Sequence, residues 1–241
     1  MLSCTEYFSG TERFCDIDMV RNAGFNSHYG AFLPNPDGAG KKTVAIRREM
    51  IAKLAGQVRT LTDFGVHVTT YMWIGGFDRR LHEPASDEKF KGEFAGPPAA
   101  WVEQVKDYVR ACYNNPDWID EVANDAVVQM EEGRSEGIFL DVTVPLNHCV
   151  CKHCCGRLKK ELGLDLKSMP LPAFSEVALD QTSDEDEDSR ERIDFSDKAY
   201  RDYLKWRLGT YVDFFRQVRE KVEQQHRPAS GAADELPLQS A

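Results

Sequence analysis

The chain has no long hydrophobic run and no concentrated basic segment. None of its apolar stretches approaches the roughly 20 residues that span a bilayer, so the sequence predicts no contact with membranes. Its 30 Lys and Arg are outnumbered by 40 Asp and Glu, which gives a formal net charge of -10. Proteins bind nucleic acid mainly through clustered Lys and Arg, so this charge balance argues against a nucleic-acid partner.

Several signatures of enzyme families are missing as well. The sequence has no Gly-rich phosphate loop, no nucleophile elbow and no His-Glu-x-x-His motif, so neither nucleotide binding nor zinc-protease chemistry is indicated. Residues 1–6 show no basic stretch followed by an apolar core, so no secretory signal is predicted. We therefore expect a cytoplasmic protein.

Helical and strand-like segments alternate along the first two thirds of the chain. Residues 13–23 predict a helix ended by Gly24, and residues 25–32 predict a strand. The same order recurs with a helix over 44–64, ended by Gly65, and a strand over 66–73. A third unit has helices over 99–112 and 116–132, the second N-capped by Asn115, and then a strand over 137–144. Three such units predict an α/β fold with a mostly parallel sheet.

The remainder of the chain predicts helices and mobile segments. A short helix is expected over 155–162, and residues 166–195 contain the acidic run 183–189, which is typical of a flexible surface insertion. Residues 196–225 predict an amphipathic helix, and residues 226–241 a disordered tail. The side chains expected to face the core from that helix are Tyr200, Tyr203, Leu204, Leu208, Tyr211, Phe215, Val218 and Val222.

The cysteines are clustered. Cys149, Cys151 and Cys154 follow a predicted strand at C-x-C-x-x-C spacing, and a tetrahedral zinc would need one more ligand. Cys112 is the preferred fourth ligand, because it precedes the helix that leads into this strand; His148, His153 and Cys155 compete with it. Four protein ligands would make the zinc structural. The alternatives are reduced, buried cysteines without metal, or an adventitious disulfide.

Four segments together resemble a known family. Residues 137–141 (GIFLD), 149–154 (CVCKHC) and 157–163 (RLKKELG) resemble the signature of hypothetical glycosyl hydrolases, family 6 of that group, which are related to the family 42 β-galactosidases. Residues 111–116 (ACYNNP) resemble the C-x-N-x-P element of the family, whose cysteine completes its zinc cluster. The resemblance covers roughly residues 10–165. It implies a (β/α)8 TIM barrel, of which residues 1–165 and the helix over 196–225 would form about the first half.

The resemblance also implies a carbohydrate site at the carboxyl ends of the barrel strands. Glycoside hydrolysis usually needs two carboxylates, of which Asp141 could supply one; the family's second carboxylate would come from a later strand. The β-galactosidases carry an Asn-Glu pair where this chain has Leu140 and Asp141. The candidate sugar-binding residues are Tyr71, Trp73, His28 and Asp78, each of which could instead be an ordinary packing or surface residue.

Three functional hypotheses follow. The first is a glycoside hydrolase-like protein that binds or hydrolyses O-glycosides, as a β-galactosidase does, with a structural Cys4 zinc. The second is a non-catalytic barrel fragment that pairs with a second copy or a complementary chain, because an open parallel sheet exposes its edge strands. The third is a zinc-stabilised interaction module without sugar chemistry.

Overall fold

The parallel sheet predicted from the sequence is present. The computed structural model describes residues 3–5, 27–32, 44–79, 82, 85–94, 108–141, 148–169 and 196–225. Four parallel strands lie in the order β1 (Ser3–Thr5), β2 (Ser27–Phe32), β3 (His67–Trp73) and β6 (Gly137–Asp141). The α/β class is therefore confirmed. Within the described ranges the sheet is open, and no closed barrel is formed.

Helices connect the parallel strands because such neighbours need a crossover. Helix α2 (Val44–Thr62) lies between β2 and β3, and α5 (Pro116–Glu131) precedes β6. Both helices agree with the predicted ranges to within two residues. Strand β1 was not predicted, since a strand of three residues is too short to show an alternating pattern.

The helix ends follow the local signals in the sequence. Gly65 follows α2 with φ of +76°, a left-handed conformation that favours glycine. Asn115 caps α5, its side chain accepting a hydrogen bond from the backbone N–H of Asp117 at 3.1 Å. Helix α6 (Lys152–Leu162) begins three residues earlier than predicted, with Cys151 as its N-cap, and ends at Gly163 with φ of +71°.

The predicted helix over 99–112 is wrong at its carboxyl end. Tyr108–Arg110 forms strand β5, which pairs antiparallel with β4 (Gly76–Asp78) in a second sheet of two strands. Val109 is buried opposite Phe77, whereas its two neighbours in β5 are half-buried, which is the alternation of a strand. Gly76 begins strand β4, and a Cβ there would clash with the carbonyl oxygen of Val109.

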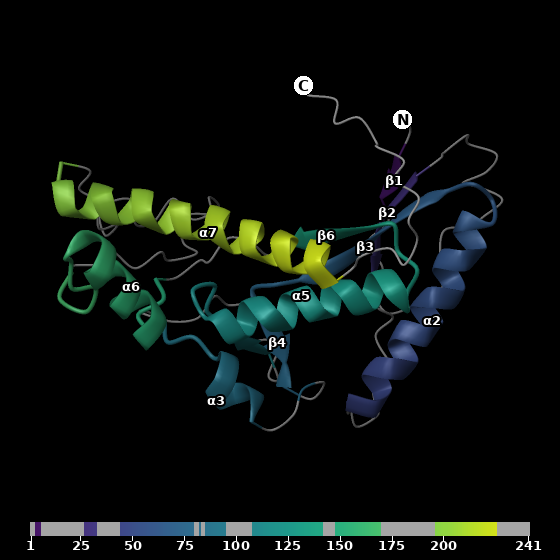
Figure 1. Ribbon diagram of the computed structural model, residues 1–241, viewed down its shortest axis with the longest axis horizontal. Helices are drawn as coiled ribbons and strands as arrows, with labels where there is room; N and C mark the ends of the chain where they lie inside the picture. The colour runs from purple at the N-terminus through teal and green to yellow at the C-terminus, as the bar shows by residue number, and fades with distance from the viewer. Residues whose placement is uncertain are drawn as a thin grey trace, which may run out of the picture.

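Helices α5 and α7 (Lys198–Gln225) lie side by side and carry the main core (Figure 1). Lys221 of α7 reaches Asp120 of α5 with 2.5 Å between Nζ and Oδ1. The predicted core-facing pattern of α7 is wrong for Leu208, which is 66% exposed, whereas Phe214 is fully buried. The buried residues of this core include Met72, Ile74, Phe77, Phe90, Trp118, Ile119, Val122, Ala126, Phe214 and Val218.

Several predicted segments lie outside the described residues: the helix over 13–23, the acidic run 183–189 and the tail 226–241.

Leu166 is buried, and it packs in a second core cluster with Cys112, Cys151, Cys154 and Tyr203. A short helix, α3 (Ser86–Phe90), follows β4. Of the helices in the described ranges, none combines the length and apolar character that crossing a membrane requires.

Candidate metal centre

Four thiols from two separate parts of the chain gather at one end of α6. Cys112 lies in the turn before α5, Cys149 and Cys151 precede α6, and Cys154 lies in its first turn. Their Sγ atoms all lie within 4.8 Å of one another. The Sγ of Cys112 is 3.4 Å from that of Cys151 and 3.5 Å from that of Cys154. The four predicted cysteines are thus brought together.

Backbone contacts, most of them from residues 90–94 at the end of α3 and after it, hold this arrangement. The N–H of Cys112 donates to the carbonyl of Phe90 at 3.4 Å, and its carbonyl accepts from the N–H of Asn115 at 3.0 Å. On the other side Cys149 forms an antiparallel bridge with Phe94, and the N–H of Val150 donates to Glu93 at 2.7 Å. Residues 90–94 therefore contact both parts of the chain that carry the four cysteines.

The thiol geometry fits a tetrahedral zinc. Zinc–sulfur bonds of about 2.3 Å in a tetrahedron place the sulfurs about 3.8 Å apart. The two separations of 3.4 Å and 3.5 Å are slightly shorter than that value, and no two of the four atoms are more than 4.8 Å apart. All four cysteines are free thiols, so no disulfide competes for them. The cluster can therefore accept a metal ion with small adjustments.

The electrostatic setting differs between two thiols of the cluster. Hydrogen bonding to the thiol of Cys112 holds the pKa of Cys151 below its ordinary value, while hydrogen bonding with Cys149 raises the pKa of Cys112. Burial lowers the pKa of Arg110, and the nearby Cys149 counteracts part of that shift. The thiolate is the form of cysteine that binds metals, and of these two thiols Cys151 is the one that ionises more readily.

The three competing ligands lie outside the group of four. The Nδ1 atom of buried His148 is 2.6 Å from the hydroxyl of Tyr203 and 2.9 Å from Nη1 of Arg207. Because arginine only donates, this nitrogen must accept, and it is engaged away from the thiols. Cys155 donates its S–H to the carbonyl of Val150 at 3.1 Å. His153 is half-buried at the second position of α6.

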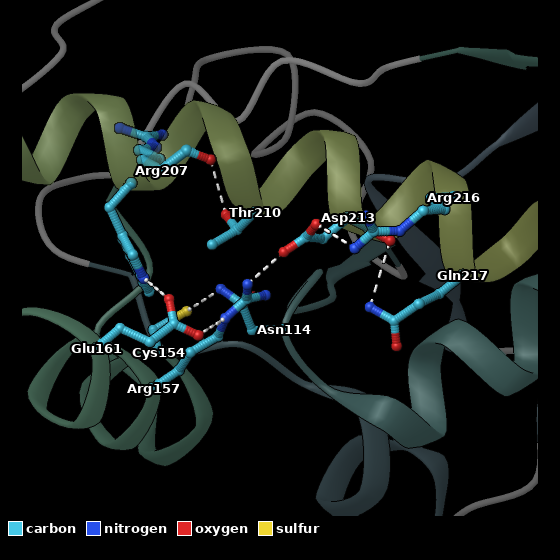
Figure 2. A network of polar contacts seen from close by, with 10 residues as sticks. Asn114, Cys154, Arg157, Glu161, Arg207, Thr210, Asp213, Arg216 and Gln217 are labelled. Carbon is cyan, nitrogen blue, oxygen red and sulfur yellow. Dashed lines mark hydrogen bonds and ion pairs between the residues drawn. The ribbon is translucent and has the colours of Figure 1, made fainter.

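A polar network links the cysteine cluster to α7. Asn114 donates to the Sγ of Cys154 at 3.3 Å, and its carbonyl oxygen accepts from Arg157 at 2.9 Å. Arg157 also pairs with Asp213 of α7 and, at 2.8 Å, with Glu161. Figure 2 shows these side chains in the space between α6 and α7. An N–H donor to a ligand sulfur is the outer-shell contact that orients a metal ligand.

This network was not predicted from the sequence. Asn114 stands two residues after Cys112, so the C-x-N-x-P spacing was a signal for it. Arg157 and Asp213 carried no such signal, because they are 56 positions apart and meet only when α6 packs against α7. Tyr203 was predicted only to face the core, yet its hydroxyl contacts His148, as does Arg207.

Three predicted site residues lie toward the carboxyl ends of β3 and β6. The register pairs Trp73 with Asp141 and Tyr71 with Phe139. These four positions share one face of the sheet, because alternate residues of a strand point to the same side. Met72, on the opposite face, packs into the core with α5 and α7. The rings of Tyr71 and Phe139 are 5.6 Å apart and both residues are half-buried. This face is therefore the one turned away from that core.

The other two predicted site residues lie elsewhere. His28 is the second residue of β2, paired with Val68, and lies four positions before the carboxyl end of that strand. Four strand residues correspond to about 13 Å. Asp78 belongs to β4 in the second sheet, opposite Tyr108. The strand positions thus group Tyr71, Trp73 and Asp141 and separate them from His28 and Asp78.

Comparison with known proteins gives partial structural matches. No protein-family model matches the chain, and no curated protein does. An α-amylase from Geobacillus thermoleovorans, solved with acarbose, matches at 17% identity and a TM-score of 0.37, over 54% of this chain and 33% of the amylase. A maltogenic α-amylase from Thermotoga neapolitana matches at 17% identity and a TM-score of 0.37, over 61% of this chain and 37% of the amylase. The chain spans about a third of the length of each of these structures.

Proposed function

We propose that this chain is a zinc-stabilised α/β domain of a glycoside hydrolase-like protein. The observation that carries the metal assignment is the convergence of Cys112, Cys149, Cys151 and Cys154, whose sulfurs lie within 4.8 Å of one another. Bound zinc would supply a structural cross-link between the turn before α5 and the start of α6, since four thiolates leave no coordination position for water. Its role is therefore in folding rather than in chemistry.

The proposed zinc site is tested by metal analysis together with thermal unfolding. We expect about one zinc per chain, and we expect Cys151→Ser to lose the zinc and to lower the melting temperature. Cys155→Ser is the matched control, because Cys155 is the adjacent thiol outside the group of four and donates to a backbone carbonyl. If Cys155→Ser releases the metal as fully as Cys151→Ser does, the assigned ligand set is wrong.

The carbohydrate part of the proposal concerns the face of the sheet that bears Tyr71, Trp73 and Asp141. It is supported by the resemblance to the glycosyl hydrolases and by the register that sets these residues side by side near the carboxyl ends of β3 and β6. Ligand sites of parallel sheets lie at that edge. Aromatic rings offer an apolar surface to a sugar, and Asp141 would be the site carboxylate for β-galactoside-like substrates.

Sugar binding is tested by calorimetric titration with a panel of β-galactosides and other glycosides, and hydrolysis by release of nitrophenol from nitrophenyl glycosides. We expect binding by the wild type, and loss of at least tenfold in affinity or activity in Asp141→Asn. Asp63→Asn, at the exposed end of α2, is the control and should change neither. Zinc binding without any sugar binding would instead support the interaction module.

A further inference from the structure

A second set of metal-ligating side chains lies apart from the thiols. His82, between β4 and α3, and Glu121 and Asp125 of α5 each place one ligand atom within 4.8 Å of the other two. We propose that these three residues bind a second divalent cation, of the kind that imidazole and carboxylates hold together, such as Mn²⁺ or Zn²⁺. No residue is shared with the cysteine cluster, so this site does not depend on the function proposed above.

Helix α5 brings the two carboxylates together. Glu121 and Asp125 are four residues apart, and residues at this spacing are neighbours on one side of a helix. Both side chains are half-buried, and Trp118 lies one turn before Glu121. Like charges at this spacing oppose helix formation, and a cation bound between them would reduce that repulsion.

His82 is held against this side of the helix by aromatic packing. Its ring centroid lies 5.0 Å from that of Phe77, and the Phe77 ring lies 5.8 Å from that of Trp118. Only 10% of the His82 side chain is exposed. The imidazole is therefore built into the contact between the second sheet and α5, and it is not a mobile surface group.

The separation of imidazole and carboxylate suits a shared ion. The Nε2 atom of His82 lies 3.5 Å from Oε1 of Glu121, which exceeds the 2.7–3.2 Å of a normal N–H···O hydrogen bond. Two ligands bound tetrahedrally at about 2.05 Å lie about 3.3 Å apart. The exposed pair of His67 and Glu136 shows the contrast, since its Nδ1 and Oε2 atoms are 2.6 Å apart, a direct hydrogen bond.

The donor atoms also predict what the ion can do. An imidazole and two carboxylates lack the soft sulfur ligands of the other cluster, so they should accept Mn²⁺, which thiolates do not favour. Three protein ligands leave at least one coordination position for water or another small ligand. The ion would join the segment after β4 to α5.

The proposal is tested by titrating Mn²⁺ into the full chain and measuring free Mn²⁺ by electron paramagnetic resonance. The protein is first dialysed against a weak chelator, which removes ions from oxygen and nitrogen ligands but spares a Cys4 zinc. We expect saturation at about one Mn²⁺ per chain. Glu121→Gln and Asp125→Asn, singly and together, preserve side-chain shape and should weaken binding at least tenfold.

Glu136→Gln is the matched control, because it removes the carboxylate of an exposed His–Glu pair and should leave Mn²⁺ affinity within twofold of wild type. Circular dichroism melts identify any variant that fails to fold, and the single variants then decide the question. Absence of saturable Mn²⁺ binding, or equal affinities in wild type and in the folded Glu121→Gln and Asp125→Asn variants, would overturn the site.

Discussion

Asn114→Ala should weaken zinc binding at the cysteine cluster without unfolding the chain. The side-chain amide donates to the Sγ of Cys154 at 3.3 Å and accepts from Arg157 at 2.9 Å. Alanine removes both contacts, whereas Arg157 keeps its ion pairs with Asp213 and Glu161. Cys154 would lose a donor that orients it and disperses its negative charge.

The expected loss is about 10- to 100-fold in zinc affinity, the usual effect of removing an outer-shell partner, which corresponds to about 1.4–2.8 kcal/mol. Affinity is measured by competition with a chromophoric chelator. Asn114→Asp should be at least as damaging, because it keeps an acceptor for Arg157 but replaces the donor with a negative charge beside the thiolates.

Gln217→Ala provides the matched control. Gln217 is another side-chain amide of the same network, and it donates to the backbone carbonyl of Asp213 at 3.3 Å without contacting a cysteine (Figure 2). Its zinc affinity should stay within twofold of wild type. The reasoning is refuted if Asn114→Ala also stays within twofold, or if Gln217→Ala weakens zinc as much.

Two further predictions concern the fold. Phe214→Ala should lower the free energy of unfolding by about 3–5 kcal/mol in urea titrations, because its buried ring lies 4.7 Å from that of Tyr113. Val212→Ala, at a 66% exposed position of α7, should change the free energy of unfolding by less than about 0.5 kcal/mol. If both variants lost the same free energy of unfolding, α7 would pack through another face. Gly65→Ala should destabilise by about 1–2 kcal/mol because of its φ of +76°. Gly56→Ala, with open space around it within α2, should stabilise by about 0.5–1 kcal/mol. If Gly65→Ala and Gly56→Ala changed the free energy of unfolding in the same direction, the assigned end of α2 would be wrong.

Local chemistry was enough to predict most element boundaries. Gly65 ends α2 and Asn115 begins α5, because a left-handed glycine and an N-cap side chain act within a few residues of themselves. The spacing of Cys149, Cys151 and Cys154 likewise predicted a metal site, since three thiols within six residues must lie near one another. Their convergence with Cys112 agrees with that prediction.

The sequence could not reveal contacts that only packing creates. Val109 lies in a strand because it pairs with Phe77, and Phe214 is buried while Leu208 is exposed because α7 turns one particular side toward α5. Asn114 meets Arg157 across 43 positions, and His82 meets Glu121 across 39. Sequence by itself determined the α/β order of elements and the thiol motif, because these depend on short-range periodicity and spacing. The tertiary structure alone decided which distant polar groups meet, because that depends on how the helices pack against the sheets.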